Sequence, residues 1–429
     1  MIRTARLGPR PRRPYAHATP AISGGPAGAY RSHFWLTYAS NFLVAAAVAV
    51  MYRFGDFITV LGGDEFHLGW IVGIGTLGSL GIRLAMGMGI DRHGPRRLWL
   101  GTTVLFAVTC FAHLAITSYS SPAVYVLRIA YCCAMSGMYL ASITFISGRT
   151  PLLRMAEMVG MLGTSGFLAC IVGTQLGDFL RGSGELERAQ LDRMFVVAGL
   201  LGLAAVLPTW LALRGYKHPM PAPCPSALGL VRRCHPGMLL AVVIVMGMAL
   251  NLPSTFLPTY AADLGIERIA LFFTVYSLAA VVTRVVTRRW PARLGLRAMV
   301  SLGVVALAGS QLLFLPVRGE WDLWLPGVGY GMAHAVLFPA SLAVGNSRFP
   351  EQHRGLGTVL ILAAWDIGSL VGMPAAGAVL HYSQTVGLPP YPTLFLLMAA
   401  LAAMVGACCL LGNWRMGMVQ KSPLAGDTW

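Results

Sequence analysis

Several ionisable residues lie inside long apolar segments of this sequence, where a charge is costly and therefore suggests a function. Five of them are candidates for a solute or proton pathway: Arg53, Asp56, Arg128, His334 and Asp366. Arginine can hold an anionic group, a carboxylate can carry a proton, and histidine titrates near neutral pH. These residue types predict the binding of a charged solute, the transfer of protons, or both.

Each candidate also has a structural interpretation. Arg53 and Asp56 stand one helical turn apart, so they can pair with each other or face a cavity and meet solute. Asp366 lies deep in its apolar run, where the loss of water favours the neutral acid, as a proton carrier requires. The alternative is a structural acid paired with a basic side chain. Arg128 can bind an anion or modulate a nearby acid, and His334 can titrate or only form a hydrogen bond.

The elements that must position these residues are transmembrane helices. The chain has 429 residues, of which 56% are hydrophobic and only 11% charged, whereas soluble domains are about 25% charged. One span needs about 20 apolar residues. We expect spans at 34–60, 67–89, 98–119, 122–147, 157–179, 193–213, 238–262, 269–289, 298–317, 322–346, 356–381 and 392–413. The sequence therefore predicts an all-α integral membrane protein of twelve helices, with no room for a sizeable soluble domain.

The basic residues predict the orientation of the chain. The formal net charge is +16, and most Lys and Arg residues fall on one side of the predicted membrane. Because basic loops stay on the cytoplasmic side, we expect a multi-pass protein of the cell inner membrane with both termini cytoplasmic. The charge then faces anionic headgroups and does not indicate nucleic acid. Residues 1–33 predict a basic disordered tail, and residues 414–429 a second cytoplasmic tail.

A degenerate repeat divides the chain into two halves. The pattern around Arg83 and Gly94 recurs around Arg284 and Gly295, 201 residues later. Many secondary transporters are built from two related halves. We expect an N-terminal bundle over 34–213, a Pro-rich cytoplasmic linker over 214–237 and a C-terminal bundle over 238–413. Arg83 and Arg284 occupy matching positions in the repeat. We expect both to support a gate, with side chains that reach toward the cytoplasmic surface, rather than to contact solute.

One segment resembles a motif of a known family. Residues 87–97 read Gly-Met-Gly-Ile-Asp-Arg-His-Gly-Pro-Arg-Arg, which resembles the cytoplasmic loop motif G-x-x-x-D-R-x-G-R-R of the major facilitator superfamily. Its gating-loop residues are Gly87, Asp91, Arg92, Gly94, Arg96 and Arg97. Arg128 with the small residues after it is similar to helix 4 of that family, and residues 256–260 and 329–334 are similar to helices 7 and 10 of its bacterial drug-efflux-like members.

The resemblance covers residues 34 to about 413. It implies the major facilitator fold, with twelve transmembrane helices in two pseudo-symmetric six-helix bundles. It also implies secondary active transport by alternating access, with proton-coupled efflux as the first expectation.

The gating-loop residues predict a latch on the cytoplasmic side. Glycines let a short loop turn tightly, and Asp91 can face the N-terminus of helix 11 near Gly355, where the helix dipole favours a negative charge. The three arginines can pair with acids such as Glu157, or they can only anchor the loop to headgroups. The second half has Ala292 in place of the acid, so its gate is expected to be weaker or held differently.

A run of small residues predicts close helix packing. The segment that contains Gly166, Gly173 and Gly177 resembles the helix 5 glycine motif of antiporters in this family, although Thr174 stands where the motif has proline. Small residues at such spacings let helix backbones approach each other. We expect these three glycines to pack helices, either within one bundle or as a flexible interface with the other half.

No pattern for an enzyme or a resident cofactor stands out. There is no Walker-type phosphate loop, so ATP does not drive the protein directly. Cys132 and Cys133 with Met135 and Met138 are soft groups that suit Cu(I), but methionine also fills apolar cores, and that interpretation is favoured. We expect no cofactor, no metal and no nucleic acid, a small-molecule solute and membrane lipid as partners, and a monomer, since one chain supplies both halves.

Three functions are compatible with these features. The first is proton-coupled efflux of a small organic molecule by a secondary active transporter. The second is uptake of a metabolite or of a soft metal ion such as copper. The third is a non-transporting sensor or assembly factor with the same fold, which the departures at Thr174 and Ala292 leave open.

Neutralisation of Asp91 distinguishes a transporter from a non-transporting scaffold. In a transporter, Asp91→Asn should remove most turnover and leave the fold intact, because the latch loses its negative charge. In a scaffold, the same variant should keep its cellular activity. Solute flux in proteoliposomes, with size-exclusion chromatography as the test of folding, measures both properties; unchanged flux contradicts the latch.

Overall fold

Twelve helices in the described part of the chain are long and apolar enough to cross a membrane, as the sequence predicts. The structure is a computed structural model that describes residues 32–93, 95–150, 152–216, 227–350 and 353–411. Within these ranges all regular structure is helical. A helix satisfies its own backbone hydrogen bonds, which a span requires because lipid offers it no partners.

The first bundle contains six spans. The first span is interrupted by a 3₁₀ turn, η2, which places Arg53 and Asp56 at the end of the bundle. The elements are α1 (Ser32–Val50), η2 (Met51–Arg53), α2 (Phe54–Val60), α3 (Glu65–His93), α4 (Pro95–Ala112), η3 (His113–Ala115), α5 (Pro122–Ser147), α6 (Leu152–Arg181) and α7 (Arg188–Leu213).

The second bundle contains the other six spans. Its elements are α9 (Met238–Asp263), α10 (Ala270–Thr287), α11 (Trp290–Leu312), η4 (Glu320–Leu323), α12 (Trp324–Ser347), α13 (Arg354–Thr385) and α14 (Pro390–Leu411). The predicted linker lies between the bundles in sequence. Its residues 217–226 fall outside the described part, and α8 (Ala227–Cys234) forms within it.

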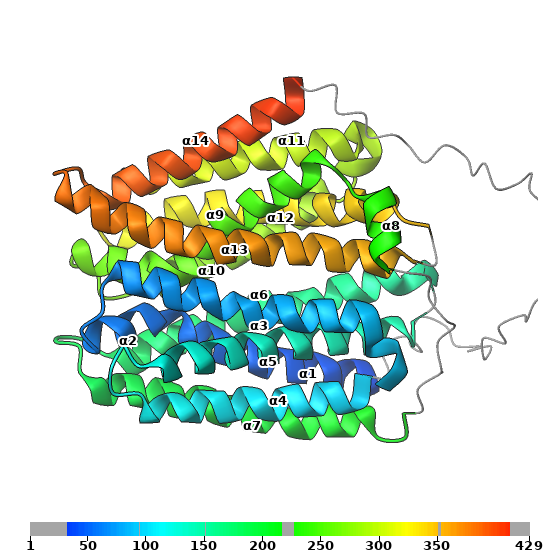
Figure 1. Cartoon of the computed structure of the whole chain (residues 1–429), viewed down its shortest axis with the longest axis horizontal. Coiled ribbons are helices and arrows are strands. Elements are labelled where there is room, and N and C mark those ends of the chain that lie inside the picture. The colour runs from blue at the N-terminus through cyan, green and yellow to red at the C-terminus, as the bar shows by residue number, and fades with distance from the viewer. Residues whose placement is uncertain (1–31, 94, 151, 217–226, 351–352, 412–429) are drawn as a thin grey trace, which may run out of the picture.

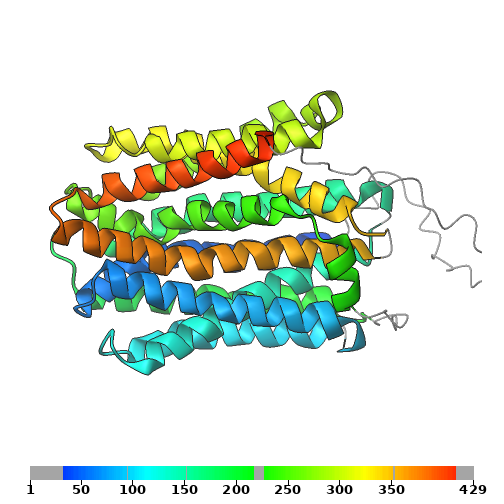
Figure 2. The same ribbon diagram turned by 45° about the horizontal axis from the view of Figure 1, so that its top comes forward.

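All twelve spans lie roughly along one axis (Figures 1 and 2). The start of α1 points toward the right end of the molecule in Figure 1, where α8 also lies, and α14 runs from the left toward that end. We call this the proximal end, which the basic residues predict to be cytoplasmic, and the opposite one the distal end. The helices α3 and α13 lie side by side along the middle of the molecule, where the two bundles meet.

Glycines bring α3 and α13 into close contact in the distal half of the molecule. A Cβ atom added to Gly69 would lie 2.4 Å from the carbonyl oxygen of Met373, and one added to Gly73 would lie 2.5 Å from Cδ of Pro374. On the opposite helix, a Cβ atom on Gly377 would lie 2.5 Å from the carbonyl oxygen of Glu65. The distal closure between the bundles therefore depends on the absence of side chains at these positions.

The gating segment differs from the loop that the sequence predicts. Helix α3 continues to His93 and α4 begins at Pro95, so most of this segment is helical. In the second half, Gly295 has a φ of 81° and interrupts α11 at the position that matches Gly94 in the repeat. A residue with a side chain rarely adopts this conformation. In the second half, Gly295 therefore makes the turn.

Substitution of Gly69 should weaken the distal closure. In Gly69→Leu, the new side chain meets the backbone of α13, so the bundles must separate at the distal end or the protein must lose about 1–3 kcal/mol of stability. Spin labels at the exposed distal positions Ser120 and Gln384, in a background without the native cysteines, should report longer distances. Gly81→Leu is the matched control, because a Cβ atom there meets nothing within 4 Å; equal effects of the two variants would contradict the closure.

Candidate functional site

The distal end of the interface between the bundles contains a buried ion network. Arg53 is only 4% exposed. Its guanidinium donates to Asp56 at 3.0 Å and to Asp178 at 3.1 Å, and it also donates to the backbone carbonyl of Glu267 at 2.6 Å. Arg53 and Asp56 therefore pair with each other, but the pair is part of a larger network. This network joins η2, α2 and α6 of the first bundle to the loop before α10 in the second.

Asp178 also caps a helix of the opposite bundle. Its Oδ2 accepts hydrogen bonds from the backbone N–H groups of Ile269 at 2.9 Å and Ala270 at 2.8 Å. The N–H groups at a helix N-terminus have no partner within the helix, and the helix dipole favours a negative charge there. Separation of the bundles at this end would break these bonds, while Arg53 and Asp178 would stay together in the first bundle.

Two exposed polar contacts join the bundles at the same end. Gly184 donates its N–H to Glu267 at 3.0 Å, which lowers the pKa of that carboxyl. The ring nitrogens Nδ1 of His67 and His381 lie 2.5 Å and 3.2 Å from the carboxylate of Asp64. Partial burial raises the pKa of Asp64, but the hydrogen bonds from His67 outweigh it and keep that pKa below its ordinary value. Exposed contacts of this kind contribute little compared with the buried network.

A second ion pair joins the bundles inside the spans. Nε of Arg83, on α3, donates to Oδ2 of Asp366, on α13, at 2.6 Å. Asp366 is 5% exposed, so each charge depends on the other to offset the loss of water. The arrangement is the structural alternative considered for Asp366, an acid paired with a basic side chain. Arg83 thus binds an acid of the opposite bundle, and its role in a gate stays a prediction.

A cluster of aromatic and basic side chains lies between the bundles near the middle of the spans. The hydroxyl of Tyr276 is hydrogen-bonded to Nδ1 of His334, and the two rings stack with centroids 5.9 Å apart. Phe167 of the first bundle and Trp365 each lie 6.1 Å from the ring of His334. The guanidinium of Arg284 lies 4.7 Å from the centre of the Phe167 ring. We call these five residues the central cluster.

Arg128 occupies a different environment. Its guanidinium lies 4.4 Å from the centre of the Phe54 ring and 4.9 Å from that of Tyr131. Nε and Nη1 are buried and have no hydrogen-bond partner in the described part of the chain. The rings around Arg128 all belong to the first bundle, whereas His334 belongs to the second. The structure therefore does not bring these two candidates together.

The predicted gating residues lie at the proximal end. Side-chain placement for residues 86–94 falls outside the described part, which includes Gly87, Asp91, Arg92 and Gly94. Arg96 and Arg97 are exposed in the first turn of α4. The latch at Asp91 therefore stays a prediction.

The helix 5 glycines pack within the first bundle. A Cβ atom on Gly173 would lie 2.3 Å from the carbonyl oxygen of Ala46, and one on Gly177 would lie 3.5 Å from that of Val50, both in the first span. One on Gly166 would meet nothing within 4 Å. The interpretation of Gly173 and Gly177 as an interface with the other half is therefore corrected to packing within one bundle.

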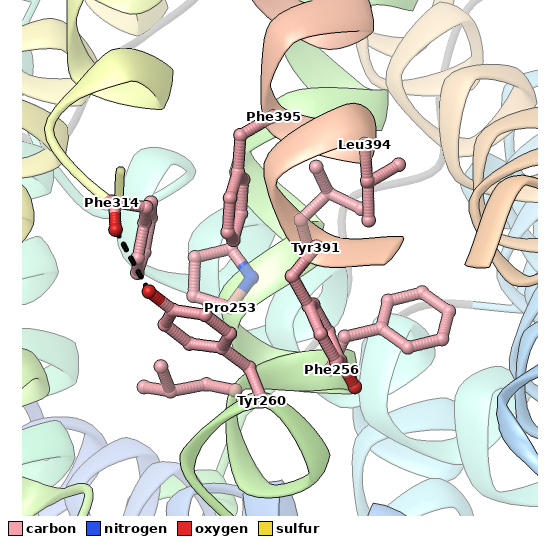
Figure 3. A pocket seen from close by; sticks show the side chains of 9 residues that line it. Pro253, Phe256, Tyr260, Phe314, Tyr391, Leu394 and Phe395 are labelled. Atoms are coloured by element: carbon pink, nitrogen blue, oxygen red, sulfur yellow. Dashed lines mark hydrogen bonds between the residues drawn. The ribbon is translucent and has the colours of Figure 1, made fainter. Parts of the chain in front are cut away.

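A small apolar pocket lies near the distal end of the second bundle (Figure 3). Residues of α9 and α14 line it together with Phe314, and the hydroxyl of Tyr260 donates to the carbonyl of Phe314 at 2.8 Å. No charged side chain lines this pocket, and all of its walls belong to one bundle. It therefore does not form part of a path between the bundles.

The soft side chains considered for copper lie in the first bundle. Cys132 and Met138 are buried in its core. Among the described residues, no three His, Cys, Asp or Glu side chains gather closely enough to hold a metal ion. This placement suits the interpretation of methionine as packing.

Asp178 and the α3–α13 glycines were not expected from the sequence. Asp178 follows Gly177 directly and lies three residues before Arg181, so it looks like an ordinary acid at the end of a span. Gly69 and Gly73 stand four residues apart, a spacing that favours close helix packing, and Gly377 ends a similar run with Gly368 and Gly372. Neither spacing indicates which helix is the partner. For Asp178, its place within the glycine segment was the one available signal.

Comparison with known sequences identifies a family. The profile described as Major Facilitator Superfamily matches residues 34–317 and 239–425, which together include all twelve spans. Solved structures share the fold. A D-xylose–proton symporter superposes with a TM-score of 0.74 at 14% identity, covering 90% of this chain and 99% of that one. A nucleoside transporter superposes with a TM-score of 0.73 at 13% identity, covering 89% and 99%.

Two curated relatives match part of the sequence. A protein of Agrobacterium vitis assigned to tartrate transport is 28% identical over 141 residues, which is 33% of this chain and 30% of that protein. The staphylopine export protein of Staphylococcus aureus strain Mu50 is 25% identical over 142 residues, or 32% and 36% of the two chains. The match thus spans about a third of each relative.

Neutralisation of Asp178 should open the distal end. Asp178→Asn removes one carboxylate from Arg53 and the anionic cap from the N-terminus of α10. The loss of one partner from a buried ion pair destabilises a protein by about 3–5 kcal/mol. The Ser120–Gln384 spin-label distance should lengthen. Asp192→Asn, which removes a partly exposed pair with Arg188 on the same helix, should leave that distance unchanged. A wild-type distance in Asp178→Asn would show that the network does not hold this end closed.

Proposed function

This chain belongs to the major facilitator superfamily of membrane transporters, and we propose that it exports a small organic solute across the cell inner membrane in exchange for protons. Members of this fold alternate between states that open to one side or the other. The proposal places the solute between the two bundles and the proton on Asp366.

The Arg83–Asp366 pair is the observation that supports the proton role. A carboxylate inside a span is costly unless it is paired, and this pair connects α3 to α13 across the interface at 2.6 Å. Protonation of Asp366 would remove the charge that attracts Arg83, so the contact between the bundles would weaken. A proton on this one group would thereby favour separation of the bundles where the pair lies.

The distal network would act as the opposing gate. With Asp178 bound to both Arg53 and the N-terminus of α10, the distal end is closed in this conformation. In the proposed cycle, solute binds from the proximal side while Asp366 releases its proton. The Arg83–Asp366 pair then re-forms, the distal network breaks, and the solute leaves toward the distal side. A proton enters from there and resets Asp366.

The direction of transport is taken from the family resemblance and from one relative. The resemblance is to drug-efflux-like members, and the staphylopine protein is an exporter by its name. The Agrobacterium vitis protein is assigned to tartrate transport, and its name gives no direction. Transport of an organic acid in the opposite direction, uptake, is therefore the second candidate. Opposite gradients in the same vesicles distinguish the two directions.

Asp366→Asn should uncouple transport from the proton gradient. Inside-out vesicles with an acidic interior should accumulate solute. The solutes offered are a cytoplasmic metabolite extract with added tartrate, and mass spectrometry identifies which of them accumulate. The variant should lose gradient-driven accumulation at least about tenfold, because an amide cannot exchange a proton, and should keep solute–solute exchange. Asp192→Asn, which changes an acid paired with Arg188 on the same helix of the first bundle, should behave as the wild type.

A double variant separates coupling from folding. Asp366→Asn alone leaves Arg83 without its partner and can destabilise the protein. Arg83→Gln with Asp366→Asn should restore the melting temperature without restoring gradient-driven accumulation. If the double variant still concentrates solute against a gradient, or if wild-type vesicles move nothing, proton-coupled export is wrong.

A further inference from the structure

Arg284 is the counterpart of Arg83 in the second half, but it lacks an equivalent partner. The two residues are 201 positions apart and occupy the same place in the repeat. Arg83 is paired with Asp366. Nε of Arg284 is buried and has no hydrogen-bond partner among the described residues, and no acid there lies within ion-pair distance of it. The repeat thus places two arginines alike and gives only one of them a counter-ion.

The Arg284 side chain faces the first bundle. Side chains on a helix point toward its N-terminus, and α10 begins at the distal end. Arg284 lies only three residues before the last residue of α10, yet its guanidinium contacts Phe167 and lies 3.8 Å from the Cβ position of Gly163. Both belong to α6 of the first bundle. Arg284 therefore contacts the opposite bundle at the interface.

The residues around Arg284 can complete a binding site. Tyr276 and His334 join a hydroxyl and an imidazole beside it, and Phe167 and Trp365 supply flat apolar surfaces. An unpaired cation at membrane depth is costly, and a carboxylate with two oxygens matches the guanidinium geometry. A cationic solute would be repelled here, and a neutral one would leave the charge uncompensated.

We propose that the central cluster is the solute site and that the solute is a small organic carboxylate, held by Arg284 through its acid group and by the aromatic side chains through its body. The proposal rests on the proposed transport function and specifies its substrate class. Because Arg284 belongs to the second bundle and Phe167 to the first, a bound carboxylate touches both bundles. It neutralises Arg284 as Asp366 neutralises Arg83, so that with solute bound the two matched arginines both have a counter-ion.

Carboxylate binding to the purified full-length protein tests the site directly. The probes are benzoate, salicylate, cinnamate and tartrate, each beside its neutral amide, measured as shifts in melting temperature and as binding isotherms. At least one acid should stabilise the wild type while its amide does not. Arg284→Gln should weaken that acid at least about tenfold, since a charged hydrogen-bond donor is lost, and Arg284→Lys should recover part of the loss. Arg193→Gln removes an exposed distal charge and should bind as the wild type.

The two matched arginines provide a folding control. Arg83→Gln should lower the melting temperature, because it leaves Asp366 unpaired, whereas Arg284→Gln should not lower it without ligand, because it leaves no acid behind. If Arg284→Gln lowers the melting temperature as much as Arg83→Gln does, Arg284 has a structural partner and the proposal is overturned. It is likewise overturned if no acid stabilises the wild type, or if the stabilisation persists in Arg284→Gln.

The outcomes separate this inference from the transport proposal. If an acid binds through Arg284 but vesicles move no solute, the site stands and transport fails. If vesicles concentrate only neutral or cationic solutes and no acid binds, transport stands and the carboxylate site fails.

Discussion

Helices α3 and α13 hold the two bundles together. Any movement of one bundle against the other must break part of the contact between these two helices. Its distal half is held by backbone packing at Gly69, Gly73 and Gly377, whereas the part that contains Arg83 and Asp366 is held by charge. Backbone packing responds to shape alone, but an ion pair responds to protons. In the proposed cycle, the same two helices therefore combine a contact that is insensitive to protonation with one that a single proton releases.

The two halves share a repeat but use it differently. Arg83 and Arg284 match in sequence, yet only the first finds a carboxylate in the described part of the chain. The glycine of the repeat makes a turn at Gly295, and Ala292 stands there in place of the acid. The repeat thus places Arg83 and Arg284 at equivalent positions. In our proposal, Arg83 supports the fold through its carboxylate partner, and Arg284 is available to a solute.

The sequence predicts the fold well and the site only in part. Twelve spans follow from the lengths of the apolar runs, and the family follows from the pattern at 87–97. Composition and spacing indicate that Arg53, Asp56 and Asp366 matter, because charges in apolar runs are few. They do not indicate the partners. Asp178 reaches Ile269 and Ala270 across more than ninety residues of chain, and Gly69 meets Met373 on another helix. Such contacts depend on helix rotation and on the docking of two bundles, which no local pattern specifies.

Asp178 as the cap of α10 has a consequence for an empty carrier. A closure worth about 3 kcal/mol keeps the distal-open state below about 1% of molecules at equilibrium. Without bound solute, such a protein would seldom open to the distal side. Few protons would therefore cross the membrane without the transport of a solute in the opposite direction. The cap would thus limit futile leak of the gradient, and the slow step of the cycle would be the release of α10 from Asp178.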